Sequence, residues 1–343
     1  MNDMIKHLCK KRGLGMKNIK YNWATYGCGV IGNQLAQAMQ ALGGSLYSVG
    51  NRTHSKAVEF AQKYGISKVY DKPEEMFTDE NVDIIYISTP HNTHIPLLRK
   101  ALSAGKHVLC EKSITLNSEE LDEAVAIAKE NNVVLGEAMT IFHMPIYRKL
   151  KELQDSGRFG KLNLIQMNFG SYKEYDMSNR FFNRNLAGGA MLDIGVYALS
   201  FTRWFMSEAP DKVQSQVRYA PTGVDEQAGI LLQNAQGEMA SIILSLHSKQ
   251  PKRGTISFDK AYIELYEYPR GDKAVITWTD DGRKEEITAG NTLEALQYEV
   301  MDMEEAVSLN GKENRMYLNY TVDVMKIMSD IRKSWGMKYP EEE

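Results

Sequence analysis

A glycine-rich turn between a strand and a helix is the feature that most constrains the fold of this chain. Lys20–Tyr26 has the composition of a short strand, and Asn33–Leu42 has that of a helix. The GCGVIG turn between them has the spacing G-x-G-x-x-G, in which the first glycine allows a tight turn and the second lets the backbone approach a pyrophosphate. The third lets the helix pack closely on the strand, so the turn predicts a dinucleotide-binding site. The predicted cofactor contacts are Gly27, Gly29, Val30, Ile31 and Gly32.

Strands and helices alternate through the part of the chain that follows this turn. Val82–Ser88 is a continuous apolar run, as is typical of a strand buried on both faces of a parallel sheet. The alternation predicts a doubly wound α/β domain over residues 17–139. The other predicted strands are Ser45–Gly50, His107–Glu111 and Val133–Glu137, and the other predicted helices are His54–Tyr64, Thr93–Ala104 and one from Asn117 or Ser118 to Asn131.

The pattern changes near residue 140. Leu162–Tyr172 is a candidate long strand, and a helical stretch runs from about Gly188 to Met206. Alternating runs such as AYIELYEY and AVITWT follow, separated by turn sequences, and Leu293–Leu309 and Arg315–Trp335 are two closing helices. Residues 140–343 are therefore predicted to form an α+β domain with a mostly antiparallel sheet. Residues 1–16 are expected to be a poorly ordered extension, and Met16 is an alternative start.

Composition excludes several classes of protein. The 343 residues carry 41 basic and 44 acidic side chains, which does not favour nucleic-acid binding. No stretch approaches the roughly 18 apolar residues of a membrane-spanning helix. The cysteines Cys9, Cys28 and Cys110 fit neither a zinc spacing nor a disulfide framework, so we expect no metal site and a cytoplasmic location. Glu341–Glu343 is expected to be only a solvated end.

The end of the second predicted strand favours NADP over NAD. A carboxylate at this position would bind the ribose diol of NAD, but the chain has Gly50-Asn51-Arg52-Thr53 there. The guanidinium of Arg52 can form a bidentate contact with the 2′-phosphate of NADP. The alternative is that Arg52 is an ordinary surface arginine. We expect Asn51 and Arg52 to contact the cofactor.

Two more loops follow predicted parallel strands, at the edge where ligands bind in doubly wound folds. STPHNTH follows the buried strand, and Glu111-Lys112 ends the next one. His91 or His94 is a candidate catalytic group, although the interpretation that both position the loop and contact the cofactor is favoured. A lysine at position 112 is well placed beside a nicotinamide, whereas in isolation it is more often a surface residue. The predicted cofactor contacts of these loops are Ser88, Thr89, Pro90, His91, His94, Glu111 and Lys112.

The stretch AGGAMLDIGVY is the most specific sequence of the second domain. Asp193 and Tyr197 are four residues apart, so a helix would present both on one face. A carboxylate and a phenol on one face suit substrate binding and proton transfer. The alternative is a buried helix with one satisfied polar pair.

Taken together, these motifs resemble the Gfo/Idh/MocA oxidoreductase family over about Lys17–Pro340. The glycine loop, STPHNTH, GKHVLCEK, EAMTIFHMP, GGAMLDIGVY and the terminal MKIMSDIRKSWGMKYP follow the family pattern in order. The resemblance implies an N-terminal Rossmann domain and a C-terminal domain built on a large open sheet. It also implies a homodimer or homotetramer that associates through this sheet.

The family's catalytic lysine falls on Lys112. Tyr197 stands where inositol dehydrogenase-like branches have a histidine, which resembles the branch of dimeric dihydrodiol dehydrogenase, NADP-dependent xylose dehydrogenase and glucose–fructose oxidoreductase. Ser113 replaces the usual proline, and we expect the backbone beside Lys112 to be less constrained for that reason.

The resemblance implies hydride transfer between NADP and a hydroxyl or carbonyl group of a sugar, polyol or diol. Tyr197 would exchange the substrate proton, with a pKa lowered by Lys112 and the oxidised nicotinamide. Asp193 would orient the lysine or hold a substrate hydroxyl. The predicted substrate contacts are Phe142, His143, Arg180, Phe182, Arg184 and Asp193.

Two rival interpretations remain. Some proteins of this fold sense the dinucleotide without catalysis, but a sensor has no need of both Lys112 and Tyr197. An enzyme that acts on a nucleotide-sugar or a biliverdin-like compound is the second rival, which the tyrosine branch disfavours.

Overall fold

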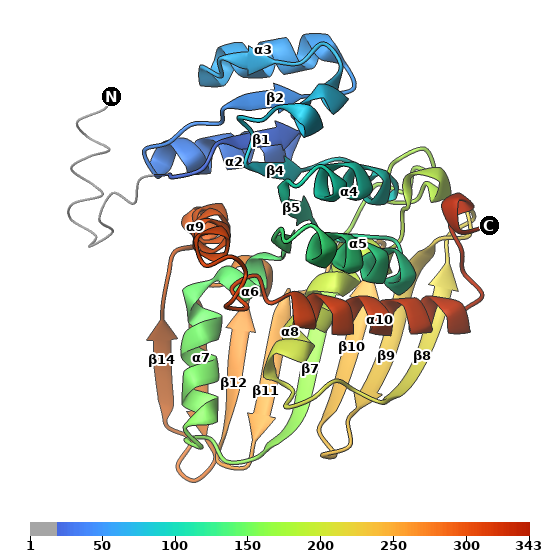
Figure 1. Ribbon diagram of the computed structural model, residues 1–343. Coiled ribbons are helices and arrows are strands. Elements are labelled where there is room, and N and C mark those ends of the chain that lie inside the picture. The colour runs from blue at the N-terminus through green and yellow to red at the C-terminus, as the bar shows by residue number, and fades with distance from the viewer. Residues whose placement is uncertain (1–18) are drawn as a thin grey trace.

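The computed structural model describes residues 19–343, which form two sheets with helices packed around them. Figure 1 shows the smaller sheet above the larger one, with helix α10 (Leu318–Ser334) passing between α5 and the larger sheet. The predicted extension over residues 1–16, the alternative start at Met16 and Cys9 all lie outside the described residues. Within residues 19–343, no helix is long and apolar enough to cross a membrane.

The smaller sheet has six parallel strands in the order β3-β2-β1-β4-β5-β6. The strand order reverses at β1 and β4, so the carboxyl ends of these neighbours frame the crevice in which doubly wound folds bind ligands. Its strands are β1 Trp23–Tyr26, β2 Ser48–Gly50, β3 Lys68–Val69, β4 Ile84–Ile87, β5 His107–Glu111 and β6 Leu135–Ala138. Its helices are α2 Val30–Ala41, α3 His54–Tyr64, α4 His94–Ser103 and α5 Ser118–Glu130, with short turns η1 Pro73–Thr78 and η2 His91–Thr93.

Local chemistry explains where these elements begin and end. All four residues of β4 are buried, as the apolar run predicts. Gly65 ends α3 in the left-handed region with φ 68°, where a residue without Cβ is favoured. The Asn117 side chain accepts a hydrogen bond from the Glu120 N–H (2.9 Å) and caps α5.

The larger sheet has eight strands in the order β14-β13-β12-β11-β7-β10-β9-β8, antiparallel except for the pair β7–β10. Its helices α7, α8 and α10 lie along one face (Figure 1). The strands are β7 Leu162–Gly170, β8 Lys212–Tyr219, β9 Asp225–Gln233, β10 Met239–Ser245, β11 Arg253–Phe258, β12 Ala261–Tyr266, β13 Lys273–Trp278 and β14 Lys284–Thr288. The helical elements are α6 Thr140–His143, α7 Pro145–Asp155, η3 Arg184–Leu186, η4 Met191–Gly195, α8 Val196–Phe205, η5 Tyr268–Arg270, η6 Thr292–Glu294, α9 Ala295–Ser308, α10 and η7 Pro340–Glu342.

These observations confirm the predicted fold class, a Rossmann-like parallel sheet followed by a larger and mostly antiparallel one. The long helix predicted from Gly188 to Met206 is instead a π-helical turn, η4, followed by α8. Gly189 stays outside the helix because its φ is 126°. A Cβ on Gly189 would lie 2.2 Å from the Asp225 carboxylate, which accepts the Met191 N–H at 2.6 Å. Helix α7 had no counterpart among the predicted elements.

Candidate active site

The glycine turn after β1 leaves room for a ligand at one point only. A Cβ on Gly27, which has φ 113°, would lie 2.8 Å from the Ser88 carbonyl oxygen, and one on Gly32 would lie 2.7 Å from that of Gly27. A Cβ on Gly29 would meet nothing within 4 Å. Val30, at the first turn of α2, is 76% exposed, although it is apolar. The open backbone and the free helix N-terminus fit a dinucleotide pyrophosphate.

The end of β2 lies beside this turn, because the Gly27 N–H donates to the Gly50 carbonyl (2.9 Å). The Asn51 side chain donates to the Thr53 carbonyl (3.0 Å), which shapes the loop. Arg52 is exposed and extends from that loop. A cationic side chain is therefore available where the adenine ribose of a dinucleotide is expected.

The loop after β4 holds the loop after β5 through its two histidines. His91 Nε2 lies 3.1 Å from the Lys112 carbonyl oxygen, and His94 Nδ1 lies 3.0 Å from that of Ser113. His94 Nε2 also lies 2.8 Å from the Thr89 carbonyl oxygen. Burial, with a smaller effect from Lys112, lowers the pKa of His91 to about 3. His91 is thus neutral at working pH, and both rings position the lysine loop.

Ser113 is fully buried, and its hydroxyl donates to the Leu192 carbonyl (3.0 Å). The backbone beside Lys112 is therefore held by the serine hydroxyl and by both histidines. The expectation that loss of proline leaves this backbone less constrained stays a prediction, and these side-chain hydrogen bonds act against it.

Lys112, Asp193 and Tyr197 come together from the two sheets. Lys112 Nζ lies 2.7 Å from the Asp193 carbonyl oxygen, 3.3 Å from Asp193 Oδ1 and 4.9 Å from the centre of the Tyr197 ring. The lysine and aspartate side chains are only 13% and 12% exposed. Among the described residues, no hydrogen bond involves the Tyr197 hydroxyl, so it is available to a substrate. The Glu111 carboxylate accepts a hydrogen bond from the Tyr86 hydroxyl, and its charge acts on both Lys112 and Tyr197.

Burial and neighbouring charges act in opposite directions on the pKa values of this cluster. Burial raises the pKa of Tyr197 above its ordinary value, and the opposing effect of Lys112 is smaller. Burial lowers the pKa of Lys112, but the charges of Asp193 and Tyr197 outweigh it, so that the lysine pKa is raised. Burial also raises the pKa of Asp193, yet Lys112 and Arg180 bring it below its ordinary value. Lys112 therefore lowers the pKa of Tyr197 as expected, but burial raises it by more, so that the net shift without a bound cofactor is upward.

The predicted substrate contacts occupy four different places, of which three involve residues 180–184. Arg180 Nη2 lies 3.6 Å from Asp193 Oδ1, beside the lysine. Phe182 is buried against the Tyr175 ring, with 5.2 Å between ring centres. The Arg184 guanidinium Nε donates to the Lys338 carbonyl (2.9 Å) and so points toward the C-terminus.

Phe142 and His143 lie in the aromatic core and not beside Lys112. The Phe142 side chain is fully buried, with its ring 5.7 Å from that of Trp204. His143 Nδ1 pairs with Asp302 (2.7 Å) in a fully buried position. Neither side chain reaches an open surface, and the assignment of these two residues to a substrate pocket stays a prediction.

The sequence analysis did not identify Asp225, which supports the helix that carries Asp193. Its carboxylate is fully buried and accepts the Met191 N–H, and burial raises the pKa of Asp225 to about 7. Asp225 is the first residue of β9 and is followed by Glu226 and Gln227, so no local sequence pattern indicates that its carboxylate is buried.

The C-terminal segment Tyr339–Glu343 contacts the loops of the site through several of its side chains. The Tyr339 hydroxyl donates to the Gly188 carbonyl (2.7 Å), and the Asn92 side chain donates to Glu341 (2.7 Å). Glu342 pairs with Arg332, whose side chain is only 3% exposed. The expectation of a solvated end holds for Glu341 and Glu343, which are exposed, and is wrong for Glu342, whose side chain is only 12% exposed because it pairs with Arg332.

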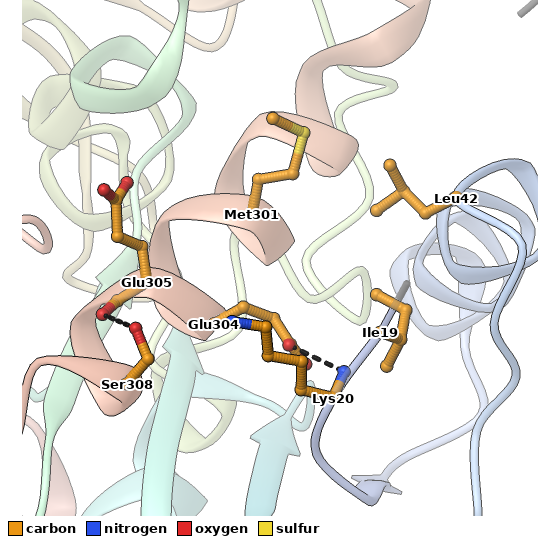
Figure 2. Close-up of a pocket in the computed structure, with 7 residues that line it drawn as sticks. All are labelled: Ile19, Lys20, Leu42, Met301, Glu304, Glu305 and Ser308. Carbon is orange, nitrogen blue, oxygen red and sulfur yellow. Dashed lines mark hydrogen bonds between the residues drawn. The ribbon is translucent and has the colours of Figure 1, made fainter. Parts of the chain in front are cut away.

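A cavity of about 380 Å³ lies away from this site, between the start of β1 and helix α9 (Figure 2). Glu304 Oε2 accepts the Lys20 N–H there at 2.9 Å. None of the predicted site residues lines it. The lining residues are Ile19, Lys20, Leu42, Met301, Glu304, Glu305 and Ser308. Over residues 19–343, no three His, Cys, Asp or Glu side chains are grouped to hold a metal ion.

Comparison with known proteins assigns both parts of the chain. A family model described as an oxidoreductase family with an NAD-binding Rossmann fold matches residues 21–139, and a Gfo/Idh/MocA C-terminal domain model matches residues 147–264. Trans-1,2-dihydrobenzene-1,2-diol dehydrogenase of Mus musculus is 30% identical over 334 residues, which cover 93% of this chain and 98% of the mouse protein. The Homo sapiens protein of the same name is 33% identical over 247 residues, 71% of this chain and 73% of the human protein.

Solved structures share the fold at lower identity. A 3-ketoreductase from Actinomadura kijaniata, in complex with NADP and TDP-benzene, aligns with a TM-score of 0.80 at 20% identity, over 91% of this chain and 97% of that one. Levoglucosan dehydrogenase, in complex with NADH and levoglucosan, aligns with a TM-score of 0.80 at 18% identity, over 91% and 98%.

Proposed function

The chain belongs to the Gfo/Idh/MocA oxidoreductase family, and from this premise we propose that it transfers a hydride between NADP and a hydroxyl or carbonyl group of a sugar, polyol or diol. The observation that carries the proposal is the position of Lys112 Nζ, held by Asp193 beside the Tyr197 ring at the carboxyl edge of the parallel sheet. The names of the relatives, a diol dehydrogenase, a ketoreductase and a sugar dehydrogenase, agree with this reaction class.

The residues around the glycine turn fit the cofactor. Gly29 and the N-terminus of α2 would hold the pyrophosphate, and Arg52 would hold the 2′-phosphate of NADP. When bound, the nicotinamide supplies or accepts the hydride. We therefore assign NADP as the preferred cofactor, with NAD as the weaker one.

Proton transfer is assigned to Tyr197. Its hydroxyl is free of protein hydrogen bonds among the described residues, and its pKa is raised by burial, so the neutral phenol is the resting form. In the reductive direction the phenol donates a proton to the carbonyl oxygen of the substrate. In the oxidative direction the phenolate accepts the proton of the substrate hydroxyl.

Lys112 and Asp193 position and polarise this group. The lysine stays protonated because Asp193 raises its pKa, and a cation near the phenol stabilises the phenolate when it forms. Asp193 holds the ammonium through its backbone carbonyl and its side chain. The two histidines hold the backbone of the same loop and take no part in proton transfer.

The test is a turnover screen of aldoses, polyols and diols with NADP, read by the absorbance of the reduced nicotinamide. Tyr197→Phe and Lys112→Met should each lower kcat by roughly 10²–10⁴-fold while NADP still binds. The double variant should be little worse than the worse single variant, because groups that act as a unit are non-additive.

Tyr262→Phe and Lys326→Met are matched controls on the outer sheet face and on the exposed side of α10, and both should keep full activity. Full activity of Tyr197→Phe would assign the proton to another group. Tight NADP binding without turnover of any compound would favour a dinucleotide sensor.

A further inference from the structure

We propose that the substrate carries an acidic group, a carboxylate or a phosphate, which Lys173 and Arg180 bind beside the reacting hydroxyl. The proposal rests on the proposed function and names the substrate class of the same site. It follows from an excess of positive charge around the Asp193 carboxylate.

Arg180 lies at the mouth of the cluster. Its Nη2 is 3.6 Å from Asp193 Oδ1, the same oxygen that lies 3.3 Å from Lys112 Nζ. The guanidinium also lies 4.1 Å from the centre of the Phe181 ring, as in a cation–π contact. Because 58% of the Arg180 side chain is exposed, its remaining N–H donors are open to a ligand.

Lys173 is the second cation that contacts the Phe181 ring. Its Nζ is 4.1 Å from the Phe181 centre, and the residue is half-buried. Within residues 19–343, its ammonium group makes no hydrogen bond or close ion pair. Burial lowers the pKa of Lys173, and repulsion from Arg180, Lys112 and Lys252 adds to this against the attraction of Asp193.

The charges at this end of the site do not balance. Lys112, Lys173 and Arg180 share one carboxylate, that of Asp193. Glu111 offsets this positive charge only in part: its charge acts on Lys112, but burial raises its pKa and its carboxylate accepts the Tyr86 hydroxyl. Lys252, the fourth cation nearby, has its own partner in Glu267 (3.1 Å). An incompletely paired and partly buried cation is costly, so an anion brought by the substrate would be stabilised.

The position of these cations limits where the acidic group lies on the substrate. Arg180 and Lys112 both reach the same Asp193 oxygen, so a substrate hydroxyl at Tyr197 and an anion at Arg180 are a few bonds apart. An arginine fork and a lysine suit the oxygens of a carboxylate or phosphate. Sugar acids and sugar phosphates combine such an anion with several hydroxyls. The cofactor pyrophosphate is expected elsewhere, at Gly29 after β1.

The experiment compares acidic and neutral members of matched pairs with NADP: glucuronate against glucose, gluconate against sorbitol, and glucose 6-phosphate against glucose. For at least one pair, the expected kcat/KM of the acidic member is at least roughly tenfold higher than that of the neutral member, as one charge-assisted hydrogen bond would give. This preference should become smaller as the salt concentration rises. A preference for glucuronate or gluconate would assign the acidic group as a carboxylate. A preference for glucose 6-phosphate would assign it as a phosphate.

Lys173→Gln and Arg180→Gln should remove this preference by raising KM for the acid, so that the ratio of kcat/KM for the acid to that for its neutral partner falls roughly tenfold, while KM for NADP stays within about threefold. Lys260→Gln and Arg283→Gln are controls at exposed turns of the larger sheet and should keep the preference. Equal use of neutral and acidic members by an active enzyme would overturn the proposal. A rise of more than about threefold in the KM for NADP in these variants would also overturn it, because the two cations would then be assigned to cofactor binding.

A calorimetric titration separates this proposal from the proposed function. If no compound is turned over, glucuronate and glucose 6-phosphate are titrated into the protein saturated with NADP. Binding that the two variants weaken roughly tenfold supports an acid-binding site even without turnover. Absence of binding, or binding that the variants leave unchanged, overturns it.

Discussion

At the scale of single residues, burial outweighs neighbouring charges at Tyr197 and His91, whereas neighbouring charges outweigh burial at Lys112 and Asp193. Tyr197 lies beside an ammonium, yet its pKa is raised, because loss of hydration disfavours the phenolate by more than Lys112 stabilises it. His91 shows the same effect with the opposite sign of charge, since burial lowers its pKa to about 3. The tyrosine is therefore a proton donor at neutral pH and becomes a base only in alkaline solution.

This electrostatics predicts a strongly pH-dependent oxidation. Oxidation needs the phenolate, so its kcat/KM should rise about tenfold per pH unit between pH 7 and 9. Reduction uses the phenol, which stays protonated, and should be flat over the same range. Initial rates in both directions across pH 6–10 test this. An inflection near pH 6.5 followed by a plateau would indicate a histidine base instead.

A second residue-scale prediction concerns the cofactor. Arg52→Ala should raise the KM for NADP by roughly 10–100-fold and change that for NAD little, because only NADP has the 2′-phosphate. The wild-type protein should have the higher kcat/KM with NADP. Lys56→Ala, an exposed lysine in the first turn of α3, is a nearby control. Equal values for the two cofactors in the wild type would contradict the assignment of Arg52.

At the scale of elements, the C-terminal segment determines how the loops of the site are held. Glu341 accepts a hydrogen bond from Asn92 in η2, and Tyr339 donates one to the backbone before η4. Glu342 accepts hydrogen bonds from Arg332 (2.8 and 2.9 Å) and from Asn117 (2.9 Å). The end of the chain thereby joins loops that belong to the two sheets (Figure 1).

Removal of the Glu342 carboxylate should destabilise the protein. Glu342→Ala would leave the buried Arg332 guanidinium without its anion, which should lower the free energy of unfolding by about 3 kcal/mol. Glu343→Ala is the matched control, since its side chain is 57% exposed and should contribute under about 1 kcal/mol. Urea unfolding at pH 7 measures both. Equal stabilities of the two variants would show that the Arg332 pair is not a structural link.

At the scale of the whole molecule, the larger sheet has one face without helices. Leu231, Gln166 and Glu264 lie on this face, because Ser241 pairs with Leu231 and Gln166, and Thr255 pairs with Gln166 and Glu264. The exposed apolar residues of this face are Leu231, Met239, Ile243, Tyr262 and Tyr266. A face of this kind is commonly covered by a second copy.

We therefore expect a homodimer that associates through this face. Light scattering at micromolar concentration should give about twice the chain mass of 38.9 kDa. Ile243→Lys should give the monomer, because a charge at the centre of an apolar interface is costly. Leu293→Lys is the control, since Leu293 is 90% exposed in the separate η6 turn. A wild-type mass near that of one chain would contradict this prediction.

The sequence by itself determined the elements whose signals are local. The bounds of α3 and β5 agree with the predicted ones, because a stop glycine and an apolar run are read over a few residues. The glycine turn and the loops that carry Ser88 and Lys112 were also placed correctly at one edge of the sheet. That follows from alternation alone, since parallel strands bring their carboxyl ends to the same side.

Only the tertiary structure decided which side chains meet across the fold and how deeply each is buried. Lys112 reaches Asp193 across 81 positions of sequence, and Arg332 reaches Leu116 across 216. Phe142 was predicted in the pocket and lies in the core, whereas Glu342 was predicted in solvent and pairs with Arg332. Local patterns contain no information on such contacts, because they depend on how two sheets and their helices pack. The pKa of Tyr197 depends on the same packing, since desolvation is set by everything that surrounds the phenol.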